Sequence, residues 1–436
     1  MKRLFLVLFA LSTAAMAVGQ SMRELIAKDP NLAAGIYTAY PVTEQIATPA
    51  PKGYKPFYIS HYGRHGSRYQ TKEEKYQTPR MILERAEKDG RLTTFGLDVL
   101  RRVRILAQDA LLRAGDLSSL GEKEHKGIAE RMVKYYPQVF SAKNGNHISC
   151  FSTQSVRCVM SMAAFSERLK EINPKLDITR QASVRHFHFT RPDRGLNTIH
   201  DTARAKAKDY QKRHTDDKAF ILRIFNDYDY AAALIREAYK SDSTYDFMGN
   251  MHDLAMIIQN YDHLTLSLHD LFTEEERYQM WSFFNIRRYL TYGPSVDYGD
   301  IRIADAKPLL RDIIERADDI ISGKTKNEIA TLRFGHDSYI IPLLALMHVE
   351  GCYGRIPFSQ IEKLPEVWCD SKITSMSVNM QFVFFRNKKG DVLVKLMHSE
   401  REVRIPLKTD TFPFYKWEDF KNYCASLYSD CAAFGY

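Results

Sequence analysis

The sequence lacks features that mark several common classes of protein. None of its six cysteines forms a Cys-x-x-Cys pair, which argues against a zinc ribbon or a thioredoxin-type redox site. It has no internal repeat, no Gly/Ser-rich or Pro-rich linker and no block of consecutive Lys and Arg that resembles a nucleic-acid-binding arm. Repeat arrays and linker-separated modules are therefore not expected.

Long hydrophobic runs are also absent. The apolar run near the start, Leu4 to Ala17, is too short to span a bilayer comfortably. Lys2 and Arg3 precede it, and Ala15-Met16-Ala17 ends it with small residues at the positions that a signal peptidase requires. We predict a signal peptide over residues 1–20, an exported (periplasmic or secreted) mature protein, and no membrane span.

The predicted export makes disulfide bonds between the cysteines possible. An even number in an exported chain permits up to three disulfides, and six cysteines allow fifteen pairings. Cys424 and Cys431 would close the shortest loop near the C-terminus, so we expect at least this pair to form.

Composition and charge are those of a globular protein with a basic surface. The 436 residues are 44% hydrophobic and 26% charged, and 62 Lys+Arg against 53 Asp+Glu give a formal net charge of +9. The excess fits either a solvated lysine-rich surface or an anionic partner. Without a basic arm, and in an exported chain, nucleic acid is the weaker partner and a phosphorylated small molecule the better one.

Hydrophobic periodicity divides the chain into segments of different character. Strand and helix patterns alternate before residue 175 and after residue 305, which predicts one α/β domain. Between them, Thr202 to Tyr292 is almost entirely helical in pattern and rich in Tyr, Leu, Ile and Met. The expected architecture is an α/β domain with an inserted all-helical cap domain, divided as residues 21–175, 176–304 and 305–436.

The predicted strands and helices can be given by range. The expected strands are 56–62, 147–153, 328–334, and a hairpin of 381–385 with 392–397 around Asn387-Lys388-Lys389-Gly390-Asp391. The expected helices are 72–88, 94–114, 122–136, 156–172 and one beginning at Ser338.

The loop after the first predicted strand carries the most specific motif, Gly63-Arg64-His65-Gly66-Ser67-Arg68. An arginine guanidinium offers a planar fork of donors that matches phosphate oxygens, and a neutral imidazole can attack phosphorus. Gly66 would let the backbone approach a ligand, and a helix starting soon after would aim N–H groups at an anion. The alternative is a charged surface loop, but the motif lies between a strand and a helix, as phosphate chemistry requires.

This motif resembles that of the histidine phosphatases, in particular the histidine acid phosphatases with their phytases and multiple inositol polyphosphate phosphatases. The similarity continues in order along the chain. The similar segments are Gly115 to Gly121, Ser152 to Arg157 with Ser161 to Phe165, Phe334-Gly335-His336-Asp337, and Val392 to Leu407.

The resemblance implies a role for each matching residue. His65 would attack phosphorus and become a phosphohistidine, and Asp337 would protonate the leaving group. The remaining matches would bind the substrate: Arg64, Arg68, Arg157 and His336 on the transferred phosphate, and Thr71 and Lys72 on other parts of the substrate. Read alone, Arg157 fits a surface residue, Asp337 a helix cap, and Lys72 a solvated charge. No cofactor or metal is implied, and we expect a monomer.

Two positions depart from the family pattern. Gln70 stands where the first motif commonly has Pro, a change expected to affect loop stiffness more than chemistry. His336-Asp337-Ser338 has the form seen in phytases and other acid phosphatases, whereas the inositol polyphosphate phosphatase subgroup commonly carries His-Ala-Glu. A carboxylic acid remains in either form.

A pair of histidines outside these motifs is a candidate metal site. If the aromatic run Val184 to Thr190 forms a strand, His186 and His188 lie on one face of it, but no third ligand with suitable spacing stands out. We therefore predict no metal site.

The sequence thus favours an exported phosphomonoesterase that works through a phosphohistidine on a polyanionic substrate such as phytate. A sugar-phosphate or broad-specificity acid phosphatase is the alternative within the class. A non-catalytic binder of phosphorylated ligands on the same fold is more remote, because a binder needs neither a nucleophile nor a proton donor.

Overall fold

The computed structural model describes residues 21–42, 47–143, 145–190 and 197–429. The predicted signal peptide and Cys431, the expected partner of Cys424, lie outside these residues. The five cysteines inside them are buried and unpaired with one another. Both expectations therefore stay predictions.

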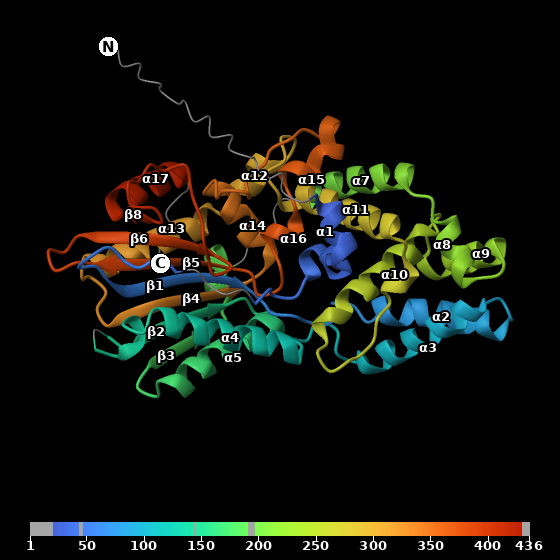
Figure 1. The fold of residues 1–436 in the computed structure, drawn as a ribbon, viewed down its shortest axis with the longest axis horizontal. Helices are drawn as coiled ribbons and strands as arrows, with labels where there is room; N and C mark the ends of the chain where they lie inside the picture. The colour runs from blue at the N-terminus through green and yellow to red at the C-terminus, as the bar shows by residue number, and fades with distance from the viewer. Residues whose placement is uncertain (1–20, 43–46, 144, 191–196, 430–436) are drawn as a thin grey trace, which may run out of the picture.

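An eight-stranded mixed sheet is built by the described residues (Figure 1). Its order is β3-β2-β4-β1-β5-β6-β7, and β8 pairs with β6. The first four strands along the chain pair in parallel, and β5 to β8 are antiparallel to their neighbours. The strands are β1 (Lys55–Arg64), β2 (His147–Ser152), β3 (Asp177–Gln181), β4 (Glu328–Gly335), β5 (Asn379–Arg386), β6 (Val392–His398), β7 (Arg401–Glu402) and β8 (Phe414–Lys416).

Both faces of the sheet are covered by helices, which makes three layers. Alternate residues of a strand point to opposite faces. Accordingly, Ile59 of β1 packs in a core with α4 (Ser119–Tyr135) and α5 (Val156–Ile172). Tyr58 and Tyr62 pack in the opposite core with α13 (Lys307–Ile321), α14 (Asp337–Leu346) and α17 (Trp417–Tyr428). Burial on both faces explains why the central strands are nearly continuous apolar runs.

A second, helical unit lies beside the sheet (Figure 1). Its core joins helices that are far apart in the sequence, because α1, α2 and α3 pack with α8, α9 and α10. α11 carries residues of this core and of a sheet core, so it connects the two units. The bounds of these helices are α1 (Met22–Lys28), α2 (Glu74–Lys88), α3 (Thr94–Asp109), α8 (Lys218–Ile224), α9 (Tyr228–Tyr239), α10 (Tyr245–Ile257) and α11 (Glu274–Tyr292). Two further helices, α7 (Asn197–His214) and α12 (Gly299–Ala304), pack with apolar residues in the sheet core that contains Tyr58.

Local sequence explains where several of these helices begin. Thr93 and Ser118 accept hydrogen bonds from the backbone three residues ahead and so cap α3 and α4. Thr273 and Glu276 form a reciprocal capping box at the start of α11. α11 is the longest of these helices and reaches from the helical unit to the sheet.

Some expectations need correction. Residues 184–190, read as a strand, form a 3-10 turn (Val184–His186) and the short helix α6 (Phe187–Thr190). β3 pairs with β2 in the sheet, although it lies beyond the expected boundary at 175. α3 ends at Asp109, five residues before the expected Ala114. The proposed domain division remains a prediction, but the helical unit contains more than the insertion because it also takes in α1 to α3.

The topology brings three loops to one edge of the sheet. β2, β4 and β1 are neighbours and run in the same direction. Arg64 of β1 lies in register with Gly335 of β4, and Ser152 of β2 lies in register with Phe334. The residues that follow these strands therefore meet at the carboxyl edge, where ligands of α/β sheets bind.

Within the described residues, none of the helices is long and apolar enough to span a membrane.

Candidate active site

His65 lies at the centre of this edge, directly after β1. Its backbone N–H donates to Gly335 O at 3.0 Å, and its carbonyl accepts from the N–H of Ser377 at 3.1 Å. The side chain is 2% exposed. The end of β4 and the segment before β5 thus fix the backbone of this residue from both sides.

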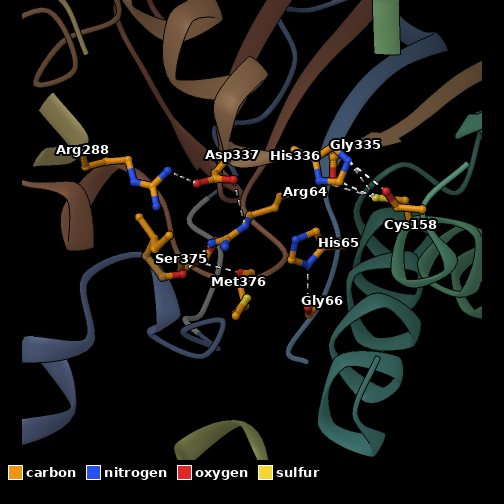
Figure 2. A network of polar contacts seen from close by, with 12 residues as sticks. Arg64, His65, Gly66, Cys158, Arg288, Gly335, His336, Asp337, Ser375 and Met376 are labelled. Atoms are coloured by element: carbon orange, nitrogen blue, oxygen red, sulfur yellow. Dashed lines mark hydrogen bonds and ion pairs between the residues drawn. The ribbon is translucent and has the colours of Figure 1, made fainter. Parts of the chain in front are cut away.

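The hydrogen bond of the His65 imidazole selects one free nitrogen. Nδ1 lies 3.0 Å from Gly66 O (Figure 2), and because a carbonyl only accepts, Nδ1 carries the proton. Nε2 is then the nitrogen with a lone pair. Burial, followed by the positive charges of Arg64, Arg157 and Arg68, holds the pKa of His65 well below its usual value. The imidazole is therefore neutral and nucleophilic even in acid.

Arg64 and Arg68 flank this imidazole and are held by backbone carbonyls. Arg64 Nη1 donates to Ile36 O at 2.5 Å and to Ser375 O at 3.0 Å. Arg68 Nη1 donates to Tyr69 O at 2.7 Å. Burial lowers the pKa of Arg64 to about 10, so its guanidinium stays charged at any physiological pH. These bonds orient the two cations without neutralising them.

Arg157 and His336 approach from two helix N-termini. Arg157 is in the first turn of α5, and His336 is the N-cap residue of α14; neither helix start has a side-chain cap. The ring of His336 is 5.6 Å from that of His65, centroid to centroid. Burial, with Arg157 as the next cause, lowers the pKa of His336 to about 3. Uncapped N–H groups and a half-buried guanidinium form a favourable environment for an anion.

Asp337 lies between two arginines (Figure 2). Its Oδ2 is 3.0 Å from Arg288 Nη1, and its Oδ1 is 4.0 Å from Arg64 Nε. Asp337 occupies the first position of α14 and makes no capping hydrogen bond, so the cap interpretation is wrong. Burial would raise its pKa, but the charges of Arg288 and Arg64 outweigh burial and hold the pKa well below the usual value.

The structure also places two residues here that the sequence analysis missed. Arg288 of α11 comes from the helical stretch interpreted as core, and nothing in its local sequence shows that it reaches the sheet. Glu124 of α4 is buried and accepts from Ser67 N at 2.8 Å, Ser67 Oγ at 2.7 Å and Ser377 Oγ at 2.7 Å. Glu124 therefore ties the His65 loop to the segment before β5.

The packing of the His65 loop against α4 requires a glycine at position 66. A Cβ atom at this position would lie 2.6 Å from Gly121 O of α4. The loop and the start of α4 thus touch backbone to backbone, so a side chain at this position would push the loop away from α4. α2 begins at Glu74, nine residues after His65, so the helix N-termini at this site belong to α5 and α14.

A basic cavity of about 900 Å³ opens beside Arg288. Thr71 and Lys72 line it, and both are exposed. Of the described residues that line it, eight are cationic and three are carboxylates, one of which pairs with Lys75. The cations are Lys72, Lys75, Arg204, Lys208, Lys212, Lys240, Arg287 and Arg288.

The geometry thus joins a neutral imidazole, three flanking arginines and a carboxylate at one sheet edge. A model of the histidine phosphatase superfamily (branch 2) matches residues 63–399. The chain belongs to this family. As a member it is a phosphoric monoester hydrolase with the histidine acid phosphatase fold.

Known relatives agree with this membership. Multiple inositol polyphosphate phosphatase 1 of Homo sapiens is 21% identical over 393 residues, which cover 84% of this chain and 78% of the human protein. The Bifidobacterium longum multiple inositol polyphosphate phosphatase, solved with inositol hexasulfate, has a TM-score of 0.75 at 19% identity and covers 92% of this chain and 99% of its own. The phytase from D. castellii has a TM-score of 0.66 at 13% identity and covers 91% and 85%.

The two departures from the phosphatase pattern can now be placed. The N–H of Gln70 donates to the Tyr76 hydroxyl at 2.7 Å, a bond that Pro could not make. The residue is buried, so this bond stiffens the loop in place of a Pro ring. The chain carries His336-Asp337-Ser338, and its fold is similar both to that of a multiple inositol polyphosphate phosphatase and to that of a phytase, so the fold alone does not assign it to either group.

The histidine pair His186 and His188 of this phosphatase lies in a turn and a short helix rather than in a strand. His186 Nε2 lies 2.7 Å from Gln181 Oε1, and its ring packs on Phe151 and Phe189. In this helical conformation His186 and His188 do not share the strand face that a common metal ligand pair would need. No cluster of three or more His, Cys, Asp or Glu suited to a metal occurs in the part of the chain that the structure describes.

Proposed function

We propose that this phosphatase hydrolyses inositol polyphosphates through a phosphohistidine at His65, with Asp337 as proton donor. The observation that carries the proposal is the His65 imidazole, whose Nε2 is left free by the Nδ1 contact with Gly66 O. Arg64, Arg68 and Arg157 surround it with donors for a phosphoryl group.

In the first step, Nε2 of His65 attacks phosphorus in line with the ester oxygen. The N–P bond forms as the P–O bond breaks, and the electron pair goes to the leaving oxygen, which takes the proton of Asp337. Charge on the equatorial oxygens is stabilised by the arginines and by His336. Because Arg64 is already oriented by Ile36 O and Ser375 O, little reorganisation is needed.

In the second step, a water molecule attacks the same phosphorus atom. The Asp337 carboxylate takes a proton from this water, the N–P bond breaks and its electron pair returns to Nε2. Inorganic phosphate leaves. Asp337 is thus acid and then base within one turnover.

The basic cavity supports a substrate with several phosphate groups. Lys72 and Thr71 lie at its wall, where a phosphate on the same ring as the reacting one would meet them. α7 and α11 add further cations, so the field favours a polyanion over a monophosphate. The human and Bifidobacterium relatives named above are described as inositol polyphosphate phosphatases.

The test compares inositol hexakisphosphate, glucose 1-phosphate and an aryl phosphate by kcat/KM. The proposal predicts a higher kcat/KM for inositol hexakisphosphate than for glucose 1-phosphate, the other alkyl phosphate. A higher value for glucose 1-phosphate would favour a sugar-phosphate phosphatase. Phosphate binding without turnover of any of the three would favour a non-catalytic binder.

We also propose that the protein is exported and monomeric. Export is supported by the basic, apolar and small-residue regions of residues 1–20. N-terminal sequencing of the mature protein should start just after this segment, and gel filtration should give one chain. An intact Met1 in the mature protein would contradict export.

A further inference from the structure

Asp337 presents a conflict between its proposed role and its surroundings. A proton donor must carry a proton, yet the carboxyl is only 13% exposed and contacts Arg288 on one side and Arg64 on the other. Arg68 from the His65 loop, Arg157 from α5, the neighbouring His336 and the phenol of Tyr62 also face it. The arginines favour the carboxylate, and His336 and the Tyr62 phenol are uncharged, so the free enzyme holds Asp337 without its proton.

The two ion pairs differ in what fixes the arginine. Arg64 is tied to Ile36 O and Ser375 O, and its side chain is 1% exposed. Arg288 has an 18% exposed side chain, sits over the Tyr292 ring at 5.1 Å, and lines the basic cavity. Its guanidinium is therefore shared between the proton donor and the space that a second phosphate group would occupy.

This inference rests on the proposed function. We propose that Arg288 is a specificity-determining switch: it pairs with Asp337 in the free enzyme, and a second phosphate group of the substrate draws it away, so that Asp337 takes up the proton it must deliver. A monophosphate leaves the cavity empty and Arg288 in place. The enzyme would then discriminate between substrates through the proton donor as well as through binding.

The proton balance is simple. When Arg288 turns to the second phosphate, Asp337 loses a cationic neighbour and gains an anionic one nearby, and both changes favour protonation. One proton enters from solvent or from an acidic phosphate oxygen of the substrate. It passes to the leaving alkoxide as the P–O bond breaks. The carboxylate that remains is the form needed to deprotonate water in the second step.

The test follows the single-turnover rate constant, measured with enzyme in saturating excess over substrate, against pH for inositol hexakisphosphate and for glycerol 2-phosphate. In the wild type, the alkaline limb of the pH–rate profile should lie at higher pH for the hexakisphosphate than for glycerol 2-phosphate. Arg288→Gln should move the limb for glycerol 2-phosphate upward by about one to three pH units. It should leave the hexakisphosphate limb nearly in place and lower kcat/KM for that substrate roughly ten- to hundredfold, through the lost charged contact.

Two matched variants separate this switch from a general loss of charge. Arg287→Gln removes a cation from the next residue of α11, which lines the same cavity but is exposed and packs on Phe284. It should weaken binding of the hexakisphosphate without moving the limb for glycerol 2-phosphate. Arg288→Lys keeps a cation next to Asp337, so its limb should stay close to that of the wild type.

Three results would overturn the switch: coincident limbs for the two substrates in the wild type, no movement in Arg288→Gln, or an equal movement in Arg287→Gln. Comparing variants on one substrate cancels the ionisation of the substrate phosphate itself. If the wild type hydrolyses glycerol 2-phosphate and the limbs do not move, only the switch fails. If the wild type hydrolyses neither substrate at any pH, the proposed function fails.

Discussion

At the scale of single residues, the role proposed for Asp337 depends on the leaving group. An inositol or sugar alkoxide needs a proton to depart, whereas an aryl phosphate leaves as a stabilised phenolate. Asp337→Asn keeps the shape of the side chain and removes the acid. We expect kcat/KM for an alkyl phosphate to fall about 10²- to 10⁴-fold and kcat/KM for an aryl phosphate to change little. Equal losses in kcat/KM for both substrates would contradict the proton-donor role.

Buried histidines give a prediction about acid stability. Burial lowers the pKa values of His61 and His125 to about 3. Between pH 6.5 and 3 the unfolded chain binds protons at these sites and the folded chain does not, so stability falls as pH falls. At pH 4.5 each of the two histidines should lower the free energy of unfolding by about 2–3 kcal/mol relative to pH 7.

Urea unfolding at pH 7 and pH 4.5 measures this loss. His125 packs against Phe165 and Phe334, so His125→Leu keeps an apolar contact and removes the titrating group. The drop in unfolding free energy between the two pH values should be smaller in this variant than in the wild type. An unchanged drop would show that His125 is not responsible.

The residues of the site were predictable to different degrees. Short motifs at or near the ends of β1, β2 and β4 contain His65, Arg64, Arg68, Arg157, His336 and Asp337. The resemblance of these motifs to those of a known family was enough to select the residues, although Arg157 and Asp337 read alone were not. Arg288 and Glu124 act through contacts made across the fold, from helices whose patterns otherwise indicate packing. No local signal marks such residues, because their partners are defined only by how α4 and α11 dock.

At the scale of elements, the strands and helices next to the site follow the sequence closely. β2 and α5 begin at the expected residues, because apolar runs and their flanking turn residues agree there. The strand expected over residues 184–190 was wrong, because a short aromatic run does not distinguish a strand from a buried helical turn. Packing of His186 and Phe189 against Phe151 decides the outcome.

One helix gives a test of the cavity. Lys208 and Lys212 of α7 line it one turn apart, whereas Arg213 on the same helix pairs with Asp209 and lies outside it. Replacing both lysines with Gln should lower kcat/KM for inositol hexakisphosphate by about tenfold or more and that for a monophosphate far less. Arg213→Gln is the control and should show no such difference between the substrates. Equal losses for both substrates in the double variant would argue against a polyanion site.

At the scale of the whole molecule, the sheet and the helical unit together form the candidate active site. The sheet supplies the nucleophile and the arginines, and the helical unit supplies Arg288 and the basic wall. The sequence predicted an α/β domain and helices between its halves. It did not predict that α1 to α3 would join those helices, since a core assembled from distant segments leaves no local pattern.

The mechanism assigns the transition-state charge to arginines. Activity should therefore survive dialysis against EDTA, with kcat/KM unchanged within error for an aryl phosphate. Loss of turnover that a divalent ion restores would contradict the mechanism.

The most direct test of the central claim is rapid-quench mapping of the phosphoryl group in Asp337→Asn with an aryl phosphate. The aryl group can leave without the acid, but the second step lacks its base, so the phosphorylated enzyme should accumulate. We predict a burst of one phenol per active site and an acid-labile, base-stable phosphoryl group on the peptide that contains His65. A phosphoryl group on another residue, or steady turnover with neither burst nor phosphopeptide, would contradict the account.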